Sequence, residues 1–179
     1  MSDLYDQIAS QRGGFERLLA RIPGFRGYLE KASRRTADRM LRDYVAELLT
    51  QQINRLVEVE RQLLDKGGLM YMSKTSSART KLQTYRDRVK AAAPGYSGFM
   101  DAIKIDEQAL ERLYSFDEAQ VRYADRVSEA LTALSDVVNQ DSLSPEIDSA
   151  IAALDRITIE ANEAFSLRED VLTNLSKSI

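Results

Sequence analysis

An uninterrupted stretch of about forty residues, from Phe25 to Leu64, constrains the fold of this chain more than any other feature. Its apolar residues recur every three to four positions, and no proline or glycine follows Gly27 within it. This spacing places one apolar stripe along a helix about 60 Å long. Gly67-Gly68 come next, where a left-handed helix cap is expected. A helix of this length needs helical neighbours along its stripe, so an all-α fold is predicted.

Four other segments carry helical patterns. Residues 1–22 predict an N-terminal helical segment that breaks at Gly13-Gly14. Residues 76–93 predict a helix that ends before Pro94, with Ser76 or Ser77 as its N-cap. Residues 106–140 and 145–178 predict two long helices joined by a short connection.

The last of these helices has the clearest heptad pattern, typical of a coiled coil, with Ser144 as N-cap and Pro145 at its first position. Arg168 falls on its apolar seam, where it either pairs with Asp117 or Glu118 across the hairpin or marks the point at which the seam opens. We predict one domain over residues 1–179. Its expected architecture is an antiparallel bundle of four main helices, plus the N-terminal segment; the main helices span 25–66, 76–93, 106–140 and 145–178. The stripes predict burial of five residues: Leu41, Leu48, Leu131, Leu154 and Phe165.

A Pro-Gly-aromatic-x-Gly-aromatic motif occurs twice, at residues 23–28 and 94–99. Glycine permits the backbone of a tight turn, and the aromatic rings can hold the turn against a core. We expect positive φ angles at Gly27 and Gly98. Either the motif opens each copy of a duplicated pair of helices, or two similar turns arose independently.

The composition limits the possible catalytic chemistry to Asp, Glu, Lys, Arg, Tyr, Ser and Thr side chains, because the chain has neither His nor Cys. Disulfides, zinc-thiolate sites, thiol nucleophiles and histidine bases are therefore absent, as are phosphate-binding glycine loops. Glu107 and Glu111 share a helix face and could hold magnesium, but with 28 acidic residues on long helices such pairs arise by chance, so a solvated face is the favoured interpretation. We predict no catalysis, no cofactor and no metal. A magnesium-dependent carboxylate enzyme is kept as an alternative.

The charges are divided unevenly along the chain. Residues 1–100 hold 18 basic and 11 acidic side chains, whereas residues 101–179 hold 7 and 17. Either the two halves pack on each other, or each half meets a partner of opposite charge. The acidic total argues against a nucleic-acid surface.

Basic residues gather on one arc of the long helix, opposite its apolar stripe, and a second candidate surface is the apolar run Leu69–Met72. The candidate partner-binding residues are Lys31, Arg34, Arg35, Arg39, Arg42, Met70 and Met72. They predict a protein-interaction or assembly module that binds an acidic protein surface or self-associates. The alternative is a peripheral membrane protein that binds anionic lipid. Neither a signal peptide nor a spanning segment is apparent, so a cytoplasmic location is predicted.

Overall fold

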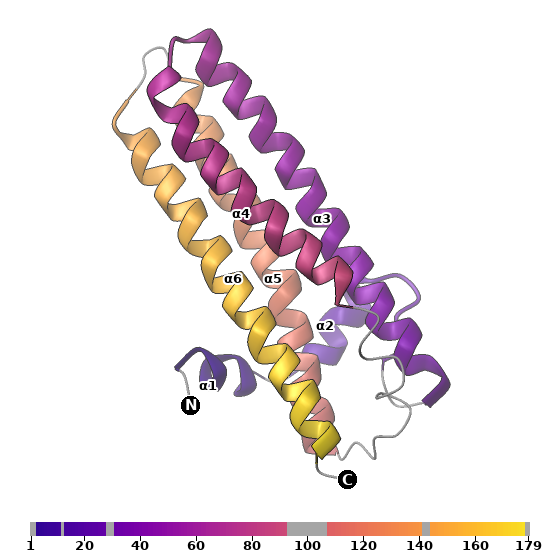
Figure 1. The fold of residues 1–179 in the computed structure, drawn as a ribbon. Coiled ribbons are helices and arrows are strands. Elements are labelled where there is room, and N and C mark those ends of the chain that lie inside the picture. The colour runs from indigo at the N-terminus through magenta and orange to yellow at the C-terminus, as the bar shows by residue number, and fades with distance from the viewer. Residues whose placement is uncertain (1–2, 12, 28–30, 93–106, 141–143, 178–179) are drawn as a thin grey trace.

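The computed structural model describes residues 3–11, 13–27, 31–92, 107–140 and 144–177, and all regular structure within these ranges is helical (Figure 1). The prediction of an all-α fold is confirmed. The described α-helices are six, and they pack together with one 3₁₀ turn: α1 (Asp3–Ala9), α2 (Gly14–Arg21), α3 (Lys31–Asp65), η1 (Leu69–Tyr71), α4 (Met72–Ala91), α5 (Glu107–Val138) and α6 (Glu146–Lys177).

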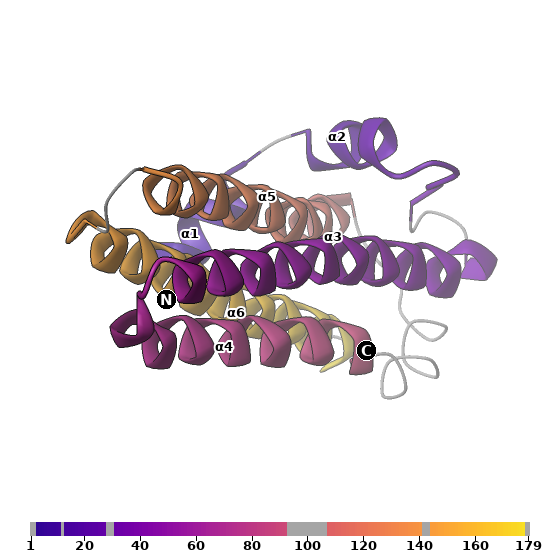
Figure 2. The ribbon, with the colours of Figure 1, turned by 90° about the horizontal axis from the view of Figure 1, so that it is seen from above.

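The four long helices lie side by side, and each packs against two others (Figure 1). Helix α3 packs against α4 and α5, and α6 likewise packs against α4 and α5. The short helices α1 and α2 pack mainly on α5, and α2 lies on the far side of the molecule from α4 (Figure 2). Helix α5 is therefore the central helix, and nearly every residue from Leu113 to Ala124 is buried.

Neighbouring helices from the two halves of the chain run parallel. Two hydrogen-bonded pairs join α4 to α6, and in both the partners are 74 residues apart in the sequence: Lys74 with Asp148, and Arg88 with Asn162. Between α3 and α5, Arg55 bonds Ser128 at a separation of 73, and just beyond the ends of these helices Lys66 bonds Gln140 at a separation of 74. A nearly constant separation means that both helices of each pair run in the same direction. Two stacked copies of one helical pair would give this arrangement, but the second turn motif lies outside the described residues, so duplication stays a hypothesis.

The long helix α3 begins later than predicted. Residues 25–27 are not helical. Gly24 and Gly27 have φ angles of +78° and +75°, which are incompatible with a right-handed helix. The positive φ of Gly27 confirms that prediction, whereas Gly98 lies outside the described residues. At the other end, Gly67 has a φ of +76° and Gly68 N–H donates to the Leu63 carbonyl at 2.7 Å, which confirms the left-handed cap.

Helix α4 begins four residues earlier than predicted. The 3₁₀ turn η1 continues directly into it at Met72, so Ser76 and Ser77 are interior helical residues and not caps. The Ser144 cap is confirmed, since its Oγ accepts the Glu146 N–H at 3.2 Å. The predicted core residues Leu41, Leu131, Leu154 and Phe165 are buried, whereas Leu48 is half-buried. Among the described helices, none combines the length and the apolar character needed to cross a lipid bilayer.

Candidate functional site

The predicted basic face is divided by the fold. Arg35 and Arg39 are exposed and Arg34 is half-buried, while the side chain of Lys31 lies outside what the structure describes. Arg42 turns inward and is only 5% exposed. Its Nε donates to Asp38 Oδ2 at 2.9 Å and its Nη1 to the main-chain oxygen of Lys90 at 3.4 Å. The prediction that Arg42 projects from a face free of the core is therefore wrong, because α4 packs over that part of α3.

Arg42 belongs to a buried ion network that joins three helices. The Arg168 side chain of α6 is fully buried, and its Nε donates to Asp117 Oδ1 of α5 at 2.5 Å. Its Nη2 donates to Asp38 Oδ1 of α3 at 2.7 Å. The predicted pairing of Arg168 with Asp117 is confirmed, whereas Asp38 as a second partner was not predicted. Two guanidinium groups thus face two carboxylates.

The network determines the ionisation of Asp38. Burial raises the pKa of its carboxyl, but the charges of Arg168 and Arg42 and their hydrogen bonds outweigh burial, so the pKa lies below its usual value. The carboxylate therefore stays ionised in the folded protein at neutral pH. A buried network with balanced charge is typical of a structural role, because each charge already has a partner of opposite sign.

Three basic residues of α4 are neutralised by acidic residues of α6. Lys74, Lys81 and Arg88 form ion pairs with Asp148, Asp155 and Glu169 of α6. The interpretation that the two halves pack on each other therefore accounts for part of the charge asymmetry.

The C-terminal end of α4 lies beside the N-terminal half of α3, as the contact of Arg42 with Lys90 shows (Figure 1). Two basic stretches that are far apart in the sequence are thereby brought to one end of the molecule. We name Arg35, Arg39 and Lys90, which are exposed, the basic end. Within the described ranges, Arg39 and Lys90 form no ion pair.

The apolar run after α3 lies at the opposite end of the molecule. Leu69 and Met70 are each 73% exposed, Met72 is half-buried, and Tyr71 is buried with its hydroxyl donating to the Ser144 carbonyl at 3.3 Å. Since α3 has 35 residues, and α4, which begins at Met72 and carries Lys90 near its end, has 20, the methionines lie about 25–45 Å from the residues of the basic end. The structure thus does not bring the two predicted surfaces together.

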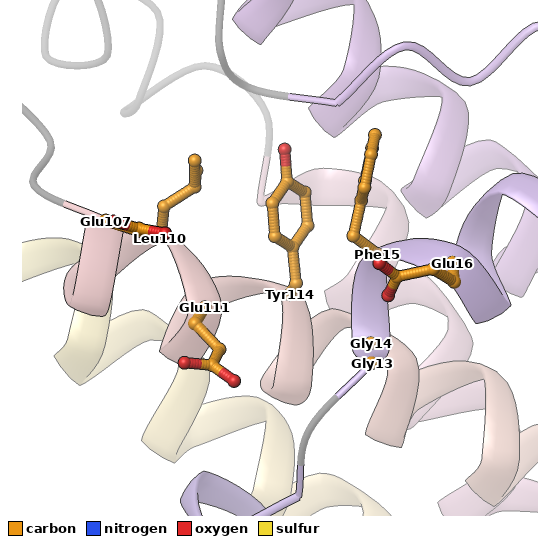
Figure 3. Close-up of a pocket in the computed structure, with 8 residues that line it drawn as sticks. All are labelled: Gly13, Gly14, Phe15, Glu16, Glu107, Leu110, Glu111 and Tyr114. Atoms are coloured by element: carbon orange, nitrogen blue, oxygen red, sulfur yellow. The ribbon is translucent and has the colours of Figure 1, made fainter.

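A hollow of about 440 Å³ lies between α2 and the start of α5 (Figure 3). Tyr114 stands there between Leu110 and Phe15, and its ring centroid is 4.8 Å from that of Phe15. The predicted pair Glu107 and Glu111 lines the hollow together with Glu16, which the sequence did not indicate. In the described part of the chain, no three carboxylates are grouped closely enough to hold a metal ion.

Comparison of the chain with protein-family models, with curated proteins and with solved structures gives no match. The function must therefore be inferred from the chain's own residues.

Proposed function

We propose that this protein is a non-catalytic interaction module, in which a bundle of four main helices holds the basic end against an acidic surface of a protein partner. The antiparallel helical hairpins α3–α4 and α5–α6 would form the scaffold. The buried network of Arg168, Asp117 and Asp38 would fix the register between them.

The placement of the exposed residues Arg39 and Lys90 at one end of the molecule is the observation that carries this proposal. The two residues lie 51 positions apart in the sequence, yet they reach the surface at the same end of the molecule. Many cations of the chain are neutralised internally, whereas these two are not paired within the described residues. Unpaired cations that gather at one place attract an acidic partner and speed its association.

The lipid alternative has less support, because its two elements, the basic face and Met70, lie at opposite ends of α3. The magnesium alternative has less support because, among the residues that the structure describes, Glu107 and Glu111 form no grouped metal site with a third carboxylate. Both alternatives nevertheless give distinct results in the experiment below.

Charge reversal at the basic end tests the proposal. The variant Arg39→Glu/Lys90→Glu changes the net charge by the same amount as the control Arg61→Glu/Arg156→Glu, whose two arginines are exposed and form no ion pair among the described residues. A partner captured by the wild-type chain, identified by mass spectrometry and then purified, should bind the first variant at least about tenfold more weakly. The control should bind like the wild type.

Four further results decide between the proposed function and its two alternatives. Partner affinity should fall as salt rises from 50 to 500 mM, because exposed charges are screened. Equal binding of both charge-reversal variants would refute the role of the basic end. Co-sedimentation with phosphatidylserine vesicles but not with phosphatidylcholine vesicles would favour the lipid alternative, and a thermal shift in magnesium would favour the enzyme.

A further inference from the structure

The outer face of α5 is covered by α1 and α2, and the two helices are anchored very differently. Helix α2 has several anchors: Leu18 is 1% exposed, and Arg21 forms two hydrogen bonds of 2.8 and 2.9 Å with Asp125. Its first residue, Gly14, lies so close to α5 that an added Cβ would be 2.7 Å from the Tyr114 carbonyl oxygen. Such a close approach of two backbones fixes α2 on α5.

Helix α1 has a single fully buried residue, Ile8, which is 1% exposed. Tyr5 is half-buried and lies 5.3 Å from Phe116 between ring centroids. Two polar contacts lie at the end of the segment, where Ser115 Oγ donates to the Gln11 carbonyl at 2.5 Å and Arg122 donates to Gln11 Oε1. Only one side chain of α1 is thus fully buried, and its other apolar contacts come from the partly buried Leu4, Tyr5 and Ala9.

A hollow of about 610 Å³ between α1 and α5 reduces the packing of α1 on the bundle. Leu4, Gln7, Ile8 and Gln11 line it from the side of α1, and α5 contributes Arg122, Tyr123 and Arg126. The facing side chains are mostly polar, so little apolar area is removed from water there. A helix of seven residues is also too short to persist without its packing.

We propose that α1 is a latch: it opens as a unit while the rest of the protein stays folded, and it uncovers an apolar surface at Phe116 and Tyr123 of α5. Both residues are buried in the closed form. Gly13, with a φ of +76°, separates the latch from α2, which stays in place through Gly14 and Arg21. The latch thus controls whether the ring of Phe116 is exposed to solvent.

Hydrogen exchange of the full chain, followed by mass spectrometry, tests this opening. The amides of Ser10 and Gln11 report on the latch, because they donate to the Asp6 and Ile8 carbonyls at 3.1 Å. We expect their protection to stay below about 10³-fold and to change little in 1 M urea. Amides of α5 between residues 113 and 124 should be protected more than about 10⁵-fold, as in a unit that opens only on global unfolding.

Two matched substitutions separate latch opening from general loss of stability. Ile8→Ala should speed exchange at Ser10 and Gln11 at least tenfold and lower the melting temperature by less than about 3 °C. Leu18→Ala removes a side chain of equal burial from α2 and should lower the melting temperature more than twice as far. Equal effects of both substitutions on the melting temperature, or equal protection of the latch and α5, would overturn the proposal.

A third variant tests the uncovered surface directly. Ile8→Asp should hold the latch open, so a hydrophobic dye should bind the folded variant at least threefold more than the wild type at 25 °C. The control Ile159→Asp changes an exposed residue on α6 and should leave dye binding unchanged. No rise in dye fluorescence for a folded Ile8→Asp protein would mean that opening α1 exposes no apolar surface, contrary to the proposal.

Discussion

Replacing Arg168 by Met should destabilise the protein more than any conservative change at its surface. Methionine keeps most of the side-chain volume but removes the guanidinium that binds Asp117 at 2.5 Å and Asp38 at 2.7 Å. Both carboxylates are buried, and water cannot replace the lost partner. The substitution therefore leaves buried negative charge with less compensation.

The size of the effect follows from this geometry. Removing one partner of a buried ion pair costs about 3–5 kcal/mol, because the other charge stays desolvated. For a chain of this length, each kcal/mol corresponds to about 2–4 °C in melting temperature. Arg168→Met should therefore lower the melting temperature by about 6–20 °C. The control Arg156→Met, on the exposed face of the same helix, should change it by less than about 2 °C.

The pH dependence identifies the charge as the cause. The pKa of Asp38 is depressed in the folded state, so the carboxylate contributes stability above its unfolded pKa of about 4 and loses it as pH falls below that value. Arg168→Met removes the strongest charge that lowers this pKa. Urea unfolding should thus show the largest difference between wild type and variant at pH 7 and a smaller one at pH 3.5.

A double substitution completes the test. Asp117→Leu combined with Arg168→Met removes a buried anion together with the cation, so it should recover part of the loss caused by Arg168→Met alone. A melting temperature of Arg168→Met within 2 °C of the wild type would refute the reasoning. So would a loss of stability that is the same at pH 7 and pH 3.5.

Three other predictions concern single positions. Gly67→Ala should lower the free energy of unfolding, measured in urea, by about 1 kcal/mol, because the φ angle of Gly67 is +76°. Gly27→Ala should lower it further, because the added Cβ would also lie 2.3 Å from the Tyr114 hydroxyl. Equal losses for the two substitutions would contradict the close packing of Gly27 on Tyr114. Leu154→Ala should cost about 2–5 kcal/mol, and an unchanged melting temperature would place the α6 seam elsewhere. Arg42→Glu should lower the melting temperature by at least 6 °C while Arg39→Glu leaves it within 2 °C in the same scan, since only Arg42 is buried beside Asp38; a stable Arg42→Glu protein would mean that Arg42 is solvated.

The sequence alone determined which segments are helical and how several of them end. Apolar residues at three- to four-residue spacing predict a helix. Gly67 caps the C-terminal end of α3 and Ser144 caps the N-terminal end of α6, in each case through contacts between residues no more than five positions apart. These signals are local, so they can be interpreted without knowing which helices pack against the segment. The predicted cap at Ser76 is the exception: the 3₁₀ turn that contains the buried Tyr71 continues directly into α4, so the helix begins before Ser76.

Apart from Arg168, whose place on the seam and pairing with Asp117 the sequence predicted, tertiary structure decided which polar residues face the interior. Arg39 and Arg42 look alike in the sequence, yet one is exposed and the other is buried beside the end of α4. Asp38 meets Arg168 across 130 residues of chain, a distance over which no local pattern carries information. A buried charge is tolerated only where a partner of opposite sign arrives from another helix, and the packing of α3, α5 and α6 determines where that happens.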